Sequence, residues 1–488
     1  MRGETLKKTV HWYDFLAISS YSLGLGTASG ILTPVLLPTL IVLFMPPEHK
    51  TTYLGTLRWV GLAVAMFIQP LGGMLSDRST SRWGRRRPFI FIGALFNVLF
   101  LAIIGYSVSL NGAEGRIFGW PLAFAVLMGG TVLLQISSNM GQGALQGLIP
   151  DLVPEQQHGR ASGVKSVLEL LPVFLVLFAG PLVDKGYIWA VVAIIMAGYL
   201  LTMLTTVLFV REEPLKEKPP ALSAQAVGRL LALTVIFVAI TRVSVWLVRS
   251  SGNFLTRQEA PLWLQVALVG AAGLAAMAGS IFLGVYFGAR VGIGKDAPQH
   301  SGFIWWVVNR LLFLAAVGSI QGFSQYYLRD VVRASNPAAM TTSLLAAVAL
   351  FLIPAALVGG YLADRFGRLR LLAVAGLAAA AGTLLLLVSG MNVLLILVSG
   401  AFIGLGTGIF YATSWALGTD LAPKQDAGKY LGISNLAGAG AGIVGASIGG
   451  PMADFFNLLR PGLGYLVIFS IYGVLLLLSV ATLRYIKK

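Results

Sequence analysis

The chain has 488 residues, of which 57% are hydrophobic and only 11% charged, and its mean hydropathy is +0.81. Soluble domains carry about 25% charged residues, so this composition excludes a water-soluble globular protein. A bilayer core of about 30 Å needs roughly 20 mostly apolar residues per helix, and the chain is long enough for a dozen or more such spans. We therefore predict a polytopic all-α membrane protein with no large soluble domain.

The net charge of +16 does not indicate nucleic-acid binding, because the basic residues lie between apolar runs rather than along a soluble stripe. A lipid bilayer is the expected partner of these charges. The chain has no Cys and four scattered His, which excludes disulfides and offers no metal-ligand spacing. Since no nucleophile–base pair or nucleotide loop is evident, the sequence predicts no enzyme and no cofactor.

Fourteen apolar runs bounded by charge, Pro or Gly predict fourteen membrane-spanning helices. No small-residue cleavage site follows Lys7 and Lys8, so the first run is expected to be its own insertion signal. The predicted spans lie at about 15–43, 52–75, 88–110, 118–142, 162–183, 187–210, 228–248, 261–289, 302–327, 340–363, 369–390, 392–418, 430–453 and 462–485.

These runs predict four parts: a six-helix bundle over 1–210, a charged linker over 211–227, two additional helices within 228–300, and a second six-helix bundle over 301–488. Lys and Arg concentrate in alternate loops, and short basic loops stay on the cytoplasmic side. The sequence therefore predicts a multi-pass protein of the plasma (inner) membrane with both termini in the cytoplasm.

The two bundles contain the same motifs. Gly-Gly-Met-Leu-Ser-Asp-Arg at 72–78 recurs as Gly-Gly-Tyr-Leu-Ala-Asp-Arg at 359–365, each after the second span of its bundle. Two further pairs agree: Asp-Leu-Val-Pro at 151–154 with Asp-Leu-Ala-Pro at 420–423, and Gly-Pro-x-x-Asp at 180–184 with 450–454. Repeats at equivalent positions indicate duplicated bundles related by an axis along the membrane normal.

An Asp at a helix end followed by Arg residues can form ion pairs across the seam between the two halves and hold one access state closed. The plainer alternative is that these Arg residues only set the topology. The candidate gating residues are Asp77, Arg78, Gly84, Arg85, Arg86, Asp151, Arg160, Asp364, Arg365, Gly367, Arg368 and Asp420.

The segment 76–90, Ser-Asp-Arg-Ser-Thr-Ser-Arg-Trp-Gly-Arg-Arg-Arg-Pro-Phe-Ile, closely resembles the loop after helix two in sucrose transporters. These belong to the glycoside–pentoside–hexuronide symporters of the major facilitator superfamily. Asn139 with Gln142-Gly143 is similar to the end of helix four in that family. The resemblance implies a major facilitator fold and sugar–proton symport. The family places an acidic residue and an Arg where this chain has Gln135 and Gln146, so both partners of its coupling pair are neutral here.

Charged residues inside a span are costly and are therefore candidates for function. Glu169, within the fifth span, is the leading coupling candidate, and Asp14 at the entrance of the first span is a second. Lys165, four residues before Glu169, offers the structural alternative of an ion pair along one helix face. The alternative for Asp14 is an interfacial anchor.

Gln135, Asn139, Gln142 and Gln146 follow spacings of 4, 3 and 4 and so share one helical face, which we expect to line a solute cavity rather than only to bond neighbouring helices. The predicted substrate-binding residues are Arg58, Gln135, Asn139, Gln142, Arg310, Gln321 and Trp415.

These observations together favour a secondary active transporter. It would move a small solute, a sugar or glycoside, by alternating access, coupled to a proton and acting as a monomer. Two alternatives stay open at this point: an exporter of lipophilic compounds, and a facilitator-like scaffold or assembly factor that transports nothing.

Overall fold

Helices make up nearly all of the structure, a computed structural model that describes residues 11–154, 157–215, 222–292, 294, 297–421 and 427–486. Among these residues, 13 helices are long and apolar enough to cross a membrane, and the long helix α16 (Ala427–Leu459) lies outside that set. The predicted all-α polytopic fold of about fourteen helices is therefore confirmed.

The first span is broken in its distal third, where α1 (Trp12–Ile31) passes through a π-helical turn, η1 (Leu32–Leu36), into α2 (Leu37–Phe44). Pro34 lies in this turn and has no N–H to donate, which interrupts the regular hydrogen-bond ladder. The short 3-10 helix η2 (Pro47–His49) then leads into the second span.

The other helices of the first bundle are α3 (Lys50–Ser76), α4 (Arg87–Tyr106), α5 (Leu122–Gln146), α6 (Leu148–Leu152), α7 (His158–Leu170), α8 (Pro172–Asp184) and α9 (Ile188–Phe209). A 3-10 turn, η3 (Ser107–Leu110), and a two-stranded hairpin, β1 (Arg116–Ile117) with β2 (Trp120–Pro121), separate α4 from α5. The hairpin moves the start of the fourth span later than predicted.

Two further long helices, α10 (Ala224–Arg257) and α11 (Leu262–Gly292), precede the second bundle. Because α10 begins at Ala224, the linker is shorter than predicted. The later elements are η5 (Ala297–His300), α12 (Ser301–Asp330), α13 (Pro337–Phe366), α14 (Arg368–Val388), α15 (Val393–Leu421), α16, α17 (Leu463–Thr482) and η7 (Leu483–Tyr485).

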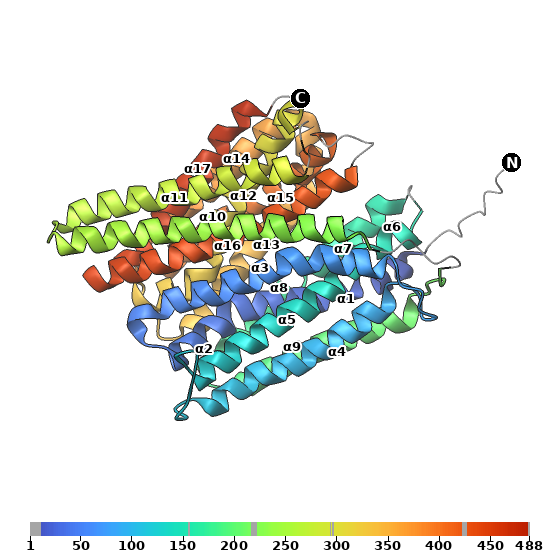
Figure 1. Ribbon diagram of the computed structural model, residues 1–488, viewed down its shortest axis with the longest axis horizontal. Helices are drawn as coiled ribbons and strands as arrows, with labels where there is room; N and C mark the ends of the chain where they lie inside the picture. Colours follow the sequence, from blue (N-terminus) through green and yellow to red (C-terminus); the bar gives the residue numbers. More distant parts are fainter. Residues whose placement is uncertain are drawn as a thin grey trace.

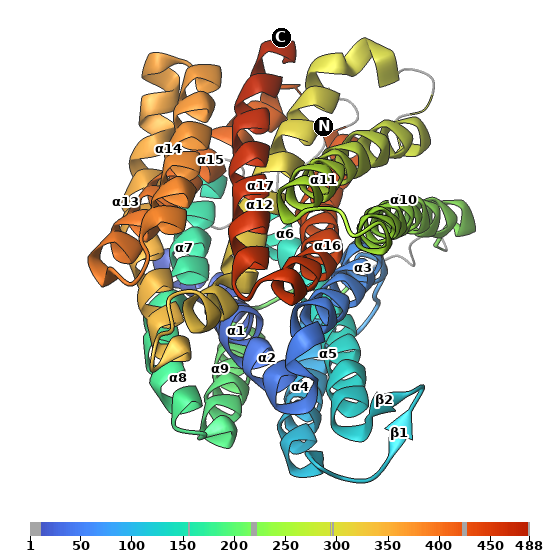
Figure 2. The same ribbon diagram turned by 90° about the vertical axis from the view of Figure 1, so that its left-hand side faces the viewer.

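The helices form two groups, with the blue-to-green α1–α9 on one side and the yellow-to-red α12–α17 on the other (Figures 1 and 2). The groups pack together mainly through α3 against α16 and α8 against α13. The pair α10 and α11 lies outside both groups, against α16, and α11 also contacts α12 and α17 (Figure 2).

Successive spans alternate in direction, so the start of α1 and the end of α17 lie at the same end of the bundle. We call this the terminal end; Arg86 and Arg368 lie there, at the starts of α4 and α14. The opposite end, where α8 ends at Asp184 and α16 passes Asp454, is the distal end.

Candidate functional site

A cavity of about 680 Å³ lies between the two helix groups and is lined by α1, α3, α5, α7, α9, α12, α15 and α16. It extends from Thr33 and Leu37 in the distal third of the first span to Gln146 and Lys165 near the terminal ends of α5 and α7. Its volume is within the range of small-molecule sites. The unwound turn η1 forms part of its distal wall.

The polar side of the cavity is the amide stripe of α5. Gln135, Asn139, Gln142 and Gln146 all line the cavity, as their spacing predicts. The Asn139 Nδ2 donates to the backbone oxygen of Gln135 at 2.8 Å and to its Oε1 at 2.9 Å. This pair fixes the orientation of both amides, and Gln69 of α3, which the sequence analysis did not single out, faces the same cavity.

Glu169 is the one carboxylate among the cavity-lining residues that the structure describes. Lys165 Nζ lies 3.4 Å from Glu169 Oε1 one helical turn away on α7, so the ion pair expected from their spacing is present. The side chain of Glu169 remains 48% exposed. The pair therefore lies within reach of a solute and of water that enters the cavity.

Arg310 of α12 faces the α5 stripe from the second helix group. Its guanidinium lies over the rings of Trp306 and Trp415, 5.8 Å and 5.2 Å from their centroids, and its Nη1 donates to Ser414 Oγ at 3.5 Å. The buried Nε of Arg310 has no hydrogen-bond partner among the described residues. An unpaired buried donor is costly and is typical of a site that a ligand completes.

Four of the other predicted site residues lie away from the cavity lining. Arg58 joins the two groups, since its Nη2 donates to the Gly318 oxygen at 3.0 Å and its guanidinium lies 5.8 Å from the Phe323 ring centroid. Asp14 caps α1, its Oδ2 accepting from the backbone N–H of His11 at 2.9 Å. Gln321 lies on α12 outside the lining, and Trp415 approaches the cavity only through Arg310.

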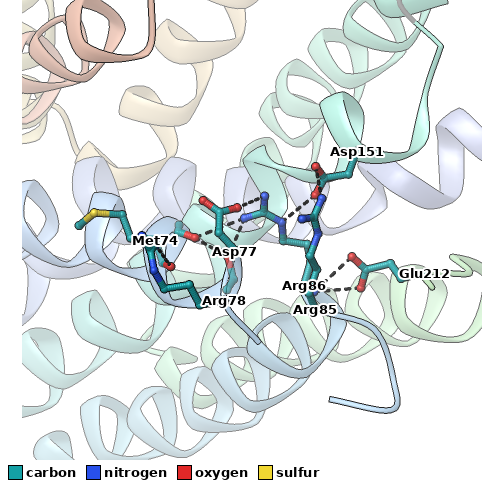
Figure 3. Close-up of polar contacts among 9 residues, drawn as sticks. Met74, Asp77, Arg78, Arg85, Arg86, Asp151 and Glu212 are labelled. Atoms are coloured by element: carbon teal, nitrogen blue, oxygen red, sulfur yellow. Dashed lines mark hydrogen bonds and ion pairs between the residues drawn. The ribbon is translucent and has the colours of Figure 1, made fainter. Parts of the chain in front are cut away.

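At the terminal end, the loop between α3 and α4 is fastened by the buried side chain of Arg86 (Figure 3). Its Nε donates to Asp151 Oδ2 at 3.0 Å, its Nη1 donates to Ser76 Oγ at 2.7 Å, and its Nη2 pairs with Asp77. Arg85 pairs with the second oxygen of Asp151. One guanidinium thus ties together the ends of α3, α4 and α6.

Glu212, which follows α9, completes this network (Figure 3). Its Oε2 accepts from the backbone N–H groups of Arg86 at 3.0 Å and Arg87 at 2.9 Å, so it caps the start of α4. Burial raises the pKa of Glu212, and the hydrogen bonds from these two amides partly oppose that rise. Glu212 lies in the segment predicted as a charged linker, and its contacts fasten that part of the segment to the start of α4.

The second bundle repeats the cluster with Arg368. Its Nη1 donates to the Ala416 oxygen at 2.6 Å and pairs with Asp420, and its Nη2 lies 3.8 Å from Asp364. In this structure both clusters lie within their own bundle, in place of the ion pairs expected across the seam. Each Asp at the end of a fourth span, Asp151 or Asp420, is simply nearer to the loop of its own bundle.

The remaining gating candidates include two Arg residues with local contacts and two Gly residues in turns. The Arg78 Nη1 donates to the Met74 oxygen at 2.9 Å, and the Arg365 guanidinium lies 5.5 Å from the Phe366 ring centroid. Arg160 is exposed. Gly84 and Gly367 adopt φ of 101° and 90°, and a Cβ on Gly84 would lie 2.4 Å from the Cβ of Glu212. The two Gly-Arg motifs thus form the turns that place Arg86 and Arg368.

Comparison with known families gives two matches. The model of the Major Facilitator Superfamily matches residues 311–488, and the model of the MFS/sugar transport protein family matches residues 48–250. Together they cover most of both helix groups. Both helix groups thus match models of major facilitator families, and the relatives named below are transport proteins.

Its curated relatives include sucrose transport protein SUC4 of Arabidopsis thaliana, 40% identical over 91 residues, which are 18% of each chain. The general alpha-glucoside permease of Schizosaccharomyces pombe is 32% identical over 130 residues, 25% of this chain and 24% of the permease. The human solute carrier family 45 member 4 is 28% identical over 137 residues, 27% of this chain and 17% of the carrier. The matched segments thus span about a fifth of the length of these relatives.

Among solved structures, a D-xylose–proton symporter aligns with a TM-score of 0.60 at 14% identity, over 97% of each chain. A POT family transporter in complex with 5-aminolevulinic acid aligns with a TM-score of 0.64 at 14% identity, over 98% of this chain and 97% of that one. These likenesses show the major facilitator fold. With 13 helices among the described residues long and apolar enough to cross a membrane, the chain is a multi-pass membrane protein of this fold.

Proposed function

We propose that the protein carries a sugar or glycoside across the membrane by alternating access, driven by a proton gradient. The amide-lined cavity between the two helix groups supports this most. Amide side chains offer donors and acceptors together, so Gln135, Asn139 and Gln142 can replace water around sugar hydroxyl groups. Arg310 would contribute further donors from the opposite wall. The relatives named as sucrose transport proteins and an alpha-glucoside permease support the same substrate class.

In this proposal the protein acts as a monomer whose bundles, 1–210 and 301–488, move against each other. The segment between α9 and α10 and the two additional helices α10 and α11 connect them. Because short basic loops stay in the cytoplasm, we assign the terminal end, and with it both chain termini, to the cytoplasmic side of the plasma membrane. The cavity extends to the terminal end, which supports our interpretation of this conformation as one that opens to the cytoplasm.

Glu169 is the proposed proton carrier. A proton on its carboxyl would neutralise it and weaken the ion pair with Lys165, which would free an ammonium group to contact the solute. The coupling residues implied by the family resemblance fall on Gln135 and Gln146, which cannot ionise. A coupled transporter with this sequence therefore needs a carboxylate elsewhere in the cavity, and Glu169 meets that requirement.

Sugar binding tests the proposed site. In a thermal-shift panel of mono- and disaccharides, we expect at least one sugar to raise the Tm of the purified protein. Asn139→Leu removes the amide at nearly constant volume and should weaken apparent affinity for that sugar about tenfold, because the solute loses hydrogen bonds in a partly buried site. Asn111→Leu, in an exposed loop at the distal end, is the control. If no sugar shifts the Tm of the folded protein, the substrate proposal is wrong.

A further inference from the structure

The Gly-Pro-x-x-Asp motif that occurs once in each bundle forms the same contact with the opposite bundle both times. Asp184, at the end of α8, lies against the start of α13, and Asp454, near the end of α16, lies against the start of α3. The terminal-end clusters do not use these carboxylates, and neither carboxylate lines the cavity. Their equivalent positions call for a common explanation.

Each carboxylate accepts two successive backbone N–H groups from a helix start in the other bundle. Asp184 accepts from Ala338 at 3.1 Å and Ala339 at 2.8 Å. Asp454 accepts from Thr51 at 3.1 Å and Thr52 at 2.6 Å, and it also accepts from the Thr51 hydroxyl. The first N–H groups of a helix have no partner within it, and its positive end favours a carboxylate, so both contacts are strong caps.

The glycine of each motif allows this approach. A Cβ on Gly180 would lie 2.6 Å from the Ala338 oxygen, and a Cβ on Gly450 would lie 2.4 Å from the Thr51 oxygen. Both oxygens belong to the first turn of the capped helix, so any larger residue would push the opposite bundle away. The motif thus combines a close approach with a carboxylate four residues later that binds the same turn.

Other contacts between the bundles lie at the same end. Lys50 Nζ is 2.6 Å from Asp330 Oδ2, and the Tyr326 hydroxyl donates to the Pro38 oxygen at 3.0 Å. Among these contacts, only those of Asp184 and Asp454 are related to each other by the internal repeat. All of them must break if the distal end is to open.

We propose that Asp184 and Asp454 are a matched pair of latches that hold the distal end shut by capping helices of the opposite bundle. They release when the bundles rock apart. The internal repeat places one latch on each side of the interface between the bundles. Together they stabilise the closed distal end on both sides, so the bundles close without twisting relative to each other. This inference rests on the proposed alternating access and assigns its distal gate. The latches are positioning residues and do not contact the solute.

The test measures the distal opening directly and needs no knowledge of the solute. The chain lacks Cys, so Asn111→Cys and Met391→Cys introduce two unique spin-label sites in exposed distal loops, one in each bundle. Double electron–electron resonance then reports the distance between the loops. We expect each of Asp184→Asn and Asp454→Asn to raise the long-distance, distal-open fraction about fivefold, and the double variant to raise it further.

Glu212→Gln is the matched control, because Glu212 also accepts two successive backbone N–H groups at a helix start but at the terminal end and within one bundle. A fall in Tm with an unchanged distance distribution would reduce Asp184 and Asp454 to structural caps and overturn the latch. If the double variant does not fold, the same distances are measured in Gly180→Ala. Its added Cβ should push α13 away and open the distal end while both carboxylates remain. An unchanged distribution in Gly180→Ala overturns the latch as well. Failure to find a transported sugar would leave these distances unaffected, so the two proposals fail separately.

Discussion

Replacing Glu169 by Gln is expected to abolish proton-driven accumulation of sugar in proteoliposomes while sparing exchange of sugar across the same membrane. Gln keeps the size and hydrogen-bonding capacity of the side chain but cannot take up a proton. Exchange needs only the binding and alternation steps, whereas accumulation needs the proton to travel with the sugar. We expect accumulation under an imposed pH gradient to fall at least about a hundredfold, to the level of empty vesicles.

Glu48→Gln is the matched control, because Glu48 is an exposed carboxylate in the distal turn η2 and outside the cavity lining. It should leave both accumulation and exchange unchanged. If Glu169→Gln still accumulates sugar at the wild-type level and an uncoupler abolishes that accumulation, the coupling group is not Glu169. Loss of exchange together with accumulation would instead assign Glu169 to sugar binding.

Arg86→Gln is expected to cause the largest loss of stability of any single substitution considered. The guanidinium of Arg86 is buried and holds Asp77 and Asp151, and its removal leaves both carboxylates without that partner. Because Asp151 keeps Arg85 and Asp77 is half exposed, the cost is that of losing the charged hydrogen bonds of a buried guanidinium, about 2–3 kcal/mol. Thermal unfolding of the purified protein in detergent should therefore show a much lower Tm, with the α3–α4 loop becoming open to protease.

Arg82→Gln in the same loop removes an equal charge from an exposed side chain and should leave the Tm nearly unchanged. Equal effects of the two substitutions would mean that the loop charges act only on membrane topology. In that case the cluster drawn in Figure 3 would have no energetic role of its own.

The number of spans could be predicted because a membrane helix needs about 20 apolar residues. The internal repeat could be predicted because the same motifs occur at equivalent positions in both halves of the sequence. The sequence also predicted which face of α5 points inward, since four amides with helical spacing cannot all face lipid. Lys165 and Glu169, four residues apart on one helix, form the ion pair that this spacing predicts.

Contacts between distant segments could not be predicted in the same way. A charged residue in a membrane span needs a partner, which is why Arg58 was predicted to be functional. The sequence does not show whether that partner is a solute or, as in the structure, the Gly318 oxygen. Glu212 lies in a charged segment whose composition indicates solvation, and only the fold brings it to the start of α4. Arg86 and Arg368 form their ion pairs within their own bundles rather than across the seam, and this choice of partner follows from the folded positions of Asp151 and Asp420.

The most direct test of the account is counterflow in proteoliposomes loaded with one unlabelled sugar at a time and supplied with a trace of the same sugar in labelled form. Counterflow requires a carrier that exposes one site to either side in turn, and it needs no driving ion. We predict transient uptake of at least one mono- or disaccharide by the wild-type protein and a loss of about tenfold or more with Asn139→Leu. Absence of counterflow for every sugar tested, with folded protein in sealed vesicles, would contradict a sugar transporter and favour a lipophilic cargo or a scaffold without transport.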